Sequence, residues 1–141
     1  MSRSPHRIIE LDTDRCHALL AAEGSGLGRV AFADAGDPDW PVVLPVNFVA
    51  LDRTIYFRTF EGSKLYAALR RQRVAFEVDA IEERWRSGWS VLAIGRLDIV
   101  RDPQLGAAVD ATLTSWAASG EQLVGLTVEN ISGREIFGPA A

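Results

Sequence analysis

The chain has 141 residues, of which 48% are hydrophobic and 24% charged, a composition that fits one globular domain and excludes a disordered chain. Its net charge of -4 makes the surface a poor match for a polyanion, so we expect no nucleic-acid partner. Because no segment has the length and hydropathy of a signal peptide or a membrane span, we expect a cytoplasmic protein without a membrane segment.

The first predicted element is a short helix in LDTDRCHALLAAEGSG. Asp12 or Thr13 is a suitable N-cap, and Gly24 is a suitable stop. The apolar stripe of this helix consists of Cys16, Leu19 and Leu20. Since the chain has a single cysteine, that residue cannot form an internal disulfide, and we predict a buried thiol.

Three extended segments follow, LGRVAFA, PVVLPVNFVAL and TIYFRT, separated by turn-rich sequence. In LGRVAFA, Val30 and Phe32 alternate with Arg29, which indicates one buried face and one polar face. The second segment is apolar almost throughout, so both of its faces should be covered, the outer one by a partner subunit or a flat ligand. Pro45 removes a ladder donor and predicts a break in regular pairing; a bulge, with Asn47 completing the neighbouring backbone, is the structural alternative.

The strand TIYFRT leads into a predicted helix through the corner RTFEGSKL, where cations and hydroxyls gather. A bound phosphate needs N–H donors at a helix N-terminus, a hydroxyl group and a cation, and Ser63 and Lys64 supply the last two. A cation at that helix end is disfavoured by the helix dipole unless an anion binds there. The alternative is that Ser63 only caps the helix, while Arg58 and Lys64 lie in solvent or pair with Glu61.

The rest of the chain reads as a strand in VAFEVD, enough extended sequence for a strand pair in GWSVLAIGRLDIVRD, a third helix in PQLGAAVDATLTSWAAS and a last extended run in LVGLTVENISGREIFG. Within that last run, ISGRE predicts a turn with a solvated Arg134, although this arginine could also approach a ligand site. Strands outnumber helices by about two to one, and their links are too short for parallel crossovers. We therefore predict an antiparallel sheet that closes toward a barrel, with short helices at its ends or sides.

Two further sets of residues bear on function. Trp85 and Trp89 flank a charged turn and are candidates for interface anchors or a lid on a flat ligand, with barrel core as the alternative for Trp89. His6 and His17 lack neighbouring ligands at metal-binding spacing, so we expect no metal centre. A serine or cysteine nucleophile would lack a partner base.

The segments PVNF, YFRT, EGSKL, VAFEVD and GWSVLAIGRLDIV occur in an order and spacing that resembles the pyridoxamine 5′-phosphate oxidase-like, FMN-binding split-barrel superfamily. The resemblance extends roughly from Leu11 to Phe137 and is closest to small bacterial members, a group that includes proteins associated with nitroimidazole resistance. It implies a mainly β fold, an antiparallel split β-barrel of Greek-key type with a few short flanking helices. The implied organisation is one domain over residues 1–141, with a core at about 11–137.

The resemblance also implies a cofactor site between two subunits. The isoalloxazine ring of FMN would lie along one strand, the phosphate would lie at the corner described above, and a third group would come from the other subunit or lie close to it. The implied residues, in these three groups, are Pro45, Val46 and Asn47; Arg58, Thr59, Ser63 and Lys64; and Trp89 and Ser90.

The chain departs from the better-studied oxidases in two places. Both ends of the stretch from Val43 to Phe48 are apolar where those enzymes carry basic residues, so the phosphate charge would be met mainly by Arg58 and Lys64. Those enzymes also carry a C-terminal Arg and His set that binds the vitamin phosphate, and no histidine follows His17 here, so oxidation of pyridoxamine phosphate is unsupported. We therefore expect a homodimer that binds FMN and acts as an oxidoreductase on an unidentified small molecule, with a nicotinamide nucleotide as reductant. The alternatives are a reductase that uses an 8-hydroxy-5-deazaflavin, a non-catalytic flavin carrier or sensor, and a haem-binding split barrel.

Overall fold

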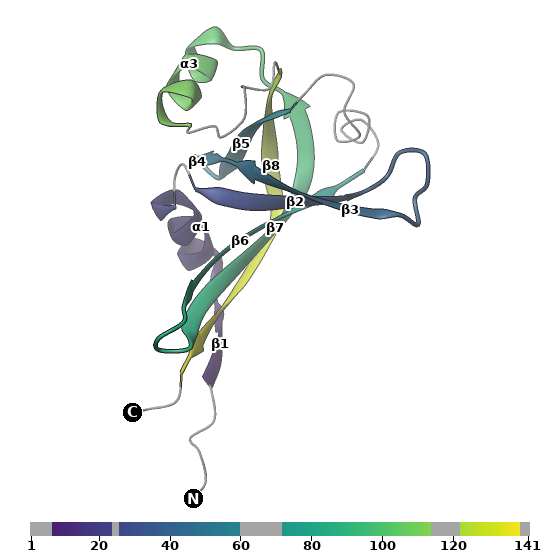
Figure 1. Ribbon diagram of the computed structural model, residues 1–141. Helices are drawn as coiled ribbons and strands as arrows, with labels where there is room; N and C mark the ends of the chain where they lie inside the picture. Colours follow the sequence, from purple (N-terminus) through teal and green to yellow (C-terminus); the bar gives the residue numbers. More distant parts are fainter. Residues whose placement is uncertain (1–6, 24–25, 60–71, 114–121, 139–141) are drawn as a thin grey trace, which may run out of the picture.

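The structure is a computed structural model that describes residues 7–23, 26–59, 72–113 and 122–138. These residues form eight antiparallel strands in one sheet and two helices (Figure 1). The strand order is β3-β2-β6-β7-β8-β5-β4, and β1 pairs with the far half of β8. The elements, in chain order, are β1 (Arg7–Leu11), α1 (Thr13–Ala22), β2 (Leu27–Ala33), β3 (Pro41–Asn47), β4 (Val49–Leu51), β5 (Thr54–Thr59), β6 (Val74–Glu82), β7 (Ser87–Ile99), α3 (Pro103–Thr112) and β8 (Gln122–Phe137).

The two ends of the sheet meet at Phe48. β3 and β4 stand at opposite ends of the strand order, yet Phe48 is the one residue that separates them in the chain. Its N–H donates to the carbonyl oxygen of Gly26 at 3.1 Å, and its side chain is fully buried. A flat sheet of this order would hold β3 and β4 many strand widths apart, so the sheet has to curl until its ends touch. This confirms the predicted antiparallel split barrel.

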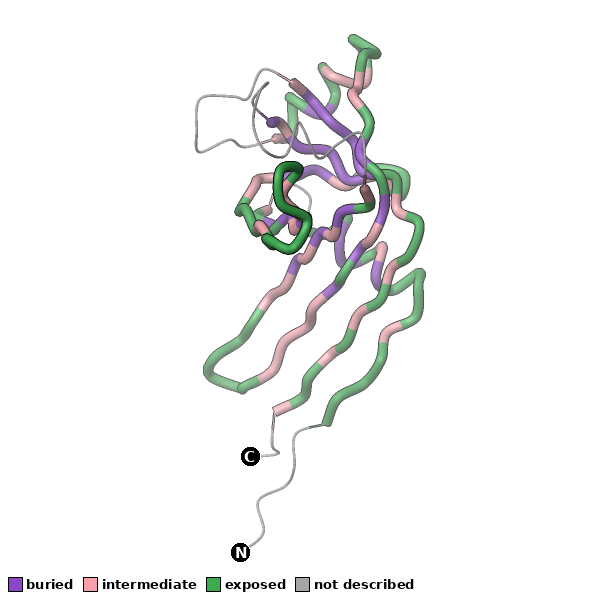
Figure 2. The backbone as a smooth tube through the Cα atoms, turned by 90° about the vertical axis from the view of Figure 1, so that its right-hand side faces the viewer, coloured by how far each residue is buried: buried purple, intermediate pink, exposed green. Residues whose placement is uncertain are grey.

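The core fills the inside of the curled sheet. The ring of Phe76 lies between those of Phe48 and Phe57, with centroid distances of 5.2 and 5.7 Å. Val30 and Phe32 also point inward, as their alternation with Arg29 predicts. Figure 2 shows the buried residues concentrated in the curled part, whereas the other end of the sheet carries mostly intermediate and exposed residues.

Helix α1 begins and packs as the sequence predicts. The side chain of Asp12 caps it by accepting from the N–H of Arg15 at 2.8 Å. Cys16, Leu19 and Leu20 are buried against the sheet, and burial raises the pKa of the Cys16 thiol above its ordinary value, with the nearby Asp12 carboxylate adding to the effect.

The second half of the chain forms longer strands than the sequence suggests. GWSVLAIGRLDI lies in one strand, β7, whose pairing with β8 shifts between Ile94 and Gly95, where β8 carries one extra residue, Glu129. The turn predicted at ISGRE is wrong, because β8 runs through it with β7 on one side and β1 on the other. A β-carbon on Gly133 would meet the sulfur of Cys16 and the carbonyl of Ser90, so this glycine permits close approach and makes no turn.

The segment PVVLPVNFVAL also differs from its prediction. Pairing does not stop at Pro45, which lies opposite Arg29 in an unbroken β2–β3 ladder. Proline is accommodated because β3 is an edge strand and its missing donor faces away from β2. Val43 and Leu44 are 60% and 37% exposed in the single chain, so the expected cover by a partner subunit or a flat ligand stays a prediction.

Of the three predicted helices, one lies outside the described residues and another is described in part. The helix expected at GSKLYAALRR lies outside the described residues. The third predicted helix is present as α3, which begins after an Asp102 N-cap and ends at Thr112, and its predicted continuation also lies outside them.

We expect Phe76→Ala to lower the free energy of unfolding by about 3–5 kcal/mol, because it empties the centre of the core. Urea denaturation followed by tryptophan fluorescence measures the change. Phe137→Ala is the matched control, because that ring is exposed and should cost less than about 1 kcal/mol. Equal losses in the two variants would contradict the assignment of the core.

Candidate functional site

The strand β3 offers an open backbone edge. In the described part of the chain no strand pairs with the side of β3 that faces away from β2. Its outer N–H and C=O groups, apart from the N–H that Pro45 lacks, can therefore bond to a flat heterocycle. Val46 packs against the core, and the Asn47 amide donates to the carbonyl oxygen of Gly26 at 3.5 Å, as the structural alternative in the sequence suggested. Pro45 and Asn47 therefore present backbone groups at the open edge, whereas the backbone groups of Val46 face β2.

The end of β5 carries Arg58 and Thr59, whose side chains leave the strand on opposite faces. Thr59 is on the core side and is 5% exposed. Arg58 is on the other side, with Tyr56, where α3 packs. The Arg58 guanidinium donates to Asp110 of α3 through Nε at 2.9 Å and Nη2 at 2.6 Å. Ser63 and Lys64 lie outside the described residues.

Asp110 is a site residue that the sequence reading missed. It lies in the last turn of α3, a helix end where the helix dipole disfavours a carboxylate and where α3 has no basic residue. An acid in that position was the available signal that a cation lies nearby.

The start of β7 places Trp89 and Ser90 on opposite faces of the sheet. Trp89 packs against the core, as the core alternative proposed, while the turn residue Trp85 is exposed. Ser90 faces outward and lines a groove of about 520 Å³ over β1, β7 and β8. The other residues that line this groove are Ile8, Glu10, Leu11, Leu92, Ile131, Ser132, Gly133 and Arg134.

The structure brings together only part of the predicted cofactor site within one chain. β3 and β5 contact each other, so the residues predicted to bind the ring, on β3, lie near Arg58 and Thr59, the described residues predicted to bind the phosphate. Ser90, however, lies far from this region. On the shared neighbour strand β8, Arg58 pairs with Leu123 and Ser90 pairs with Arg134. Leu123 and Arg134 are eleven residues apart, or roughly 36 Å along the strand. Figure 1 shows the same separation: β5 lies near α3 at one end of the molecule, and the start of β7 lies at the other end, near β1.

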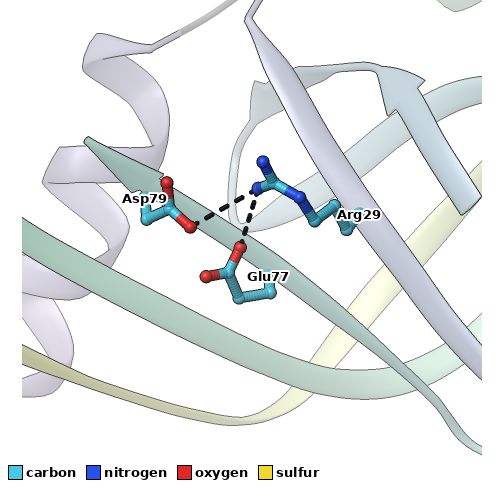
Figure 3. A network of polar contacts seen from close by, with 3 residues as sticks. All are labelled: Arg29, Glu77 and Asp79. Atoms are coloured by element: carbon cyan, nitrogen blue, oxygen red, sulfur yellow. Dashed lines mark hydrogen bonds and ion pairs between the residues drawn. The ribbon is translucent and has the colours of Figure 1, made fainter. Parts of the chain in front are cut away.

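A network of charges lies on the outer face of β2 and β6 (Figure 3). One guanidinium nitrogen of Arg29 lies 3.2 Å from a Glu77 oxygen and 3.4 Å from an Asp79 oxygen. Burial raises the pKa of Glu77 to about 7, the Asp79 carboxyl adds to the rise, and Arg29 partly offsets it. Two carboxyl groups thus share one arginine, and Glu77 binds a proton at a higher pH than an ordinary glutamate does.

The described residues contain no group of three His, Cys, Asp or Glu side chains placed to hold a metal ion. His17 borders a cavity of about 40 Å³, and burial lowers its pKa, helped by Arg53 and opposed by Asp14. Neither helix in the described ranges is long and apolar enough to cross a membrane.

Comparison with known proteins gives consistent matches. Residues 12–135 match the family described as pyridoxamine 5′-phosphate oxidase. The chain is 31% identical over 140 residues to the uncharacterised protein Rv0080 of Mycobacterium tuberculosis, covering 95% of this chain and 89% of that protein.

Solved structures share the fold as well. The FAD-binding protein of Mycobacterium smegmatis is 29% identical, with a TM-score of 0.69 over 92% of this chain and 98% of that one. A FAD-binding protein of Mesorhizobium loti, at 23% identity, gives a TM-score of 0.74 over 94% and 98% of the two chains. The second likeness bears on the fold alone.

The raised pKa of Glu77 predicts a pH dependence of stability. A carboxyl group with a folded pKa of about 7 and an ordinary pKa of 4.5 contributes stability that is complete below pH 4.5 and lost as the pH rises through 7. We expect Glu77→Gln to lose less stability than the original protein between pH 4.5 and 7.5, as measured by urea denaturation at each pH. Glu83→Gln, in the exposed turn after β6, is the control. Parallel pH profiles for Glu77→Gln and the original protein would contradict the assignment.

Proposed function

The chain belongs to the pyridoxamine 5′-phosphate oxidase family, and we propose that it binds FMN and acts as a flavin-dependent oxidoreductase on a small molecule. The FAD-binding function of the Mycobacterium smegmatis relative supports a flavin nucleotide as the cofactor. Between the two nucleotides we favour FMN, because the corner after β5 has the features of a site for one terminal phosphate.

The observation that carries this proposal is the open edge of β3 beside the end of β5. A flavin ring has alternating donors and acceptors along one edge, and an open strand edge presents the complementary pattern in its backbone. The contact between β3 and β5 puts the end of β5, from which the chain continues into the predicted phosphate corner, near this edge. Among the described residues, the open edge of β3 suits the ring and Arg58 suits a phosphate.

In this proposal the protein residues bind and orient the cofactor, and the bound flavin supplies the two-electron chemistry. Pro45 and Asn47 hold the ring through backbone groups on the open edge of β3, Val46 contacts the ring between them, and Arg58 with Lys64 offsets the phosphate charge. Such chemistry needs no acid or base to generate a nucleophile. A nicotinamide nucleotide is the proposed reductant.

We propose that a second copy of the chain completes the site. Ser90 lies too far from Arg58 along β8 for one FMN molecule to touch both in the same chain. The outer face of the sheet, which carries Ser90, also exposes apolar side chains that a partner would cover: Ile8, Val43, Ile81, Leu92 and Ile136. In the proposed dimer, Ser90 of one chain lies close to Arg58 of the other. The same interface then brings the two residues to one FMN molecule and covers the exposed apolar side chains.

Two alternatives share the fold. A deazaflavin would occupy the same ring site, and a carrier or sensor would bind flavin without turnover. A haem site is less well supported, because His17, the one histidine among the described residues, borders a cavity of about 40 Å³, far below the size of a ligand pocket.

The visible spectrum and mass of the molecule that co-purifies with the protein test the proposal. We expect a flavin spectrum and the mass of FMN. The mass of FAD or of a deazaflavin would correct the cofactor, and a protein that binds no flavin on titration would contradict the proposal. Turnover of the bound flavin with a nicotinamide nucleotide separates an enzyme from a carrier.

We expect Lys64→Ala to weaken FMN binding by about 1.5–3 kcal/mol, the range of a charge-assisted hydrogen bond, while the fold stays intact. Riboflavin lacks the phosphate, so its affinity should not change. Isothermal titration with both ligands and circular dichroism of the variant measure these effects. The phosphate assignment fails if both ligands lose the same affinity.

We also expect FMN to stabilise a dimer, because a ligand that binds only the assembled state shifts the assembly equilibrium by mass action. Sedimentation of the apo and FMN-loaded protein over a dilution series should show dissociation at a higher concentration for the apo form. A monomer that binds FMN with full affinity would contradict the shared site.

A further inference from the structure

Arg58 and Asp110 form an ion pair with two hydrogen bonds at the proposed cofactor site. Both carboxylate oxygens of Asp110 accept, one from Nε at 2.9 Å and one from Nη2 at 2.6 Å. Arg58 is only 21% exposed in its side chain, whereas Asp110 is 46% exposed. A two-bond contact of this kind fixes the plane of a guanidinium group as well as its position.

The packing of α3 against β5 fixes the position of Asp110 beside Arg58. The preceding residue, Val109, is fully buried in a small cluster with Val49, Tyr56 and Leu123, so α3 is anchored on the outer side of β5. Tyr56 and Arg58 point to the same side of β5, which places Arg58 directly beneath the last turn of the helix. Asp110 is thus carried by an anchored element rather than by a free loop.

Asp110 also lies where a carboxylate is unfavourable for the helix itself. The last turn of α3 carries the negative end of the helix dipole and contains no basic residue to offset an acid. The ion pair with Arg58 offsets this cost. A residue placed against the preference of its own helix and in contact with a proposed ligand-binding arginine points to a role at the site.

We propose that Asp110 is a positioning residue that orients Arg58 toward the phosphate of the flavin nucleotide. This inference rests on the proposed function. The carboxylate engages the Nε and Nη2 edge of the guanidinium, so the other edge is directed away from α3. Without Asp110 the guanidinium group would lose the two-bond contact that fixes its plane, and ligand binding would bear more of the cost of ordering the long side chain.

Asp110 has a second, opposing effect, because its negative charge reduces the attraction of the site for an anion. That effect is weakened by solvent, since nearly half of the Asp110 side chain is exposed. The orientation of Arg58 is a local effect that solvent does not screen. We therefore expect the loss of orientation to outweigh the gain in charge when Asp110 is neutralised.

The test compares FMN and riboflavin binding by isothermal titration in the full chain. Asp110→Asn keeps the size of the side chain and removes its charge, and we expect it to weaken FMN binding roughly five- to tenfold. Riboflavin affinity should stay within about twofold, because riboflavin has no phosphate for Arg58 to meet. A purely structural role of Asp110 in holding α3 would instead change both affinities together.

Two further variants serve as controls. Asp110→Glu keeps the charge and should restore part of the FMN affinity. Asp98→Asn removes the same charge from β7, on the side of the sheet that Tyr56 and Arg58 share, without any ion pair to a described residue, and should leave FMN binding unchanged or slightly tighter.

The outcomes separate this inference from the function on which it rests. If the original protein prefers FMN to riboflavin and Asp110→Asn keeps or increases that preference, Asp110 does not position Arg58. If Asp110→Asn weakens both ligands equally, its role is structural. If the original protein shows no preference between FMN and riboflavin, the phosphate site itself is wrong, and the role of Asp110 falls with it.

Discussion

The closure of the sheet at Phe48 is the constraint on which the other features of the structure depend. A single buried residue connects the two terminal strands of the sheet, and it is held by a backbone hydrogen bond to Gly26 and by an edge-to-face contact with Phe76. Because the connection is so short, β3 cannot move away from β4 and β5 without opening the core. The open edge of β3 and the end of β5 are therefore fixed relative to each other before any ligand binds, and preorganisation of this kind lowers the cost of binding.

The curl also divides the sheet into two functional parts. The curled part encloses the core and holds the proposed ring and phosphate sites, while the arm formed by the outer parts of β1, β6, β7 and β8 has two solvated faces (Figure 2). An arm of this kind adds little to the stability of a single chain, since it buries few side chains. In the proposed dimer a second chain covers its apolar residues, and the groove beside Ser90 lies on the same surface.

Much of the fold could be predicted from the sequence because its signals are local. The Asp12 cap, the stripe on α1 and the alternation in β2 and β6 each depend on neighbouring residues, and the structure confirms them. The errors arose where pairing with distant strands decides the outcome. Ser132 and Gly133 resemble a turn locally but are held in β8 by β7 and β1, and Pro45 looks like a break but is tolerated at an edge. Asp110 was missed for the same reason, since its partner is 52 positions away in the chain.

The position of β8 in the sheet has a consequence for how the protein is made. β8 follows every other described strand in the chain, yet it lies between β7 and β5 and also carries β1. During synthesis, β1, β5 and β7 therefore each have an unpaired edge until the segment from Gln122 onward has left the ribosome. Only then can the barrel close. Pairings between residues so distant in sequence form slowly, and open strand edges invite association with other chains in the meantime. A nascent chain stalled before β8 would thus be a natural client for chaperones, whatever cofactor the finished protein binds.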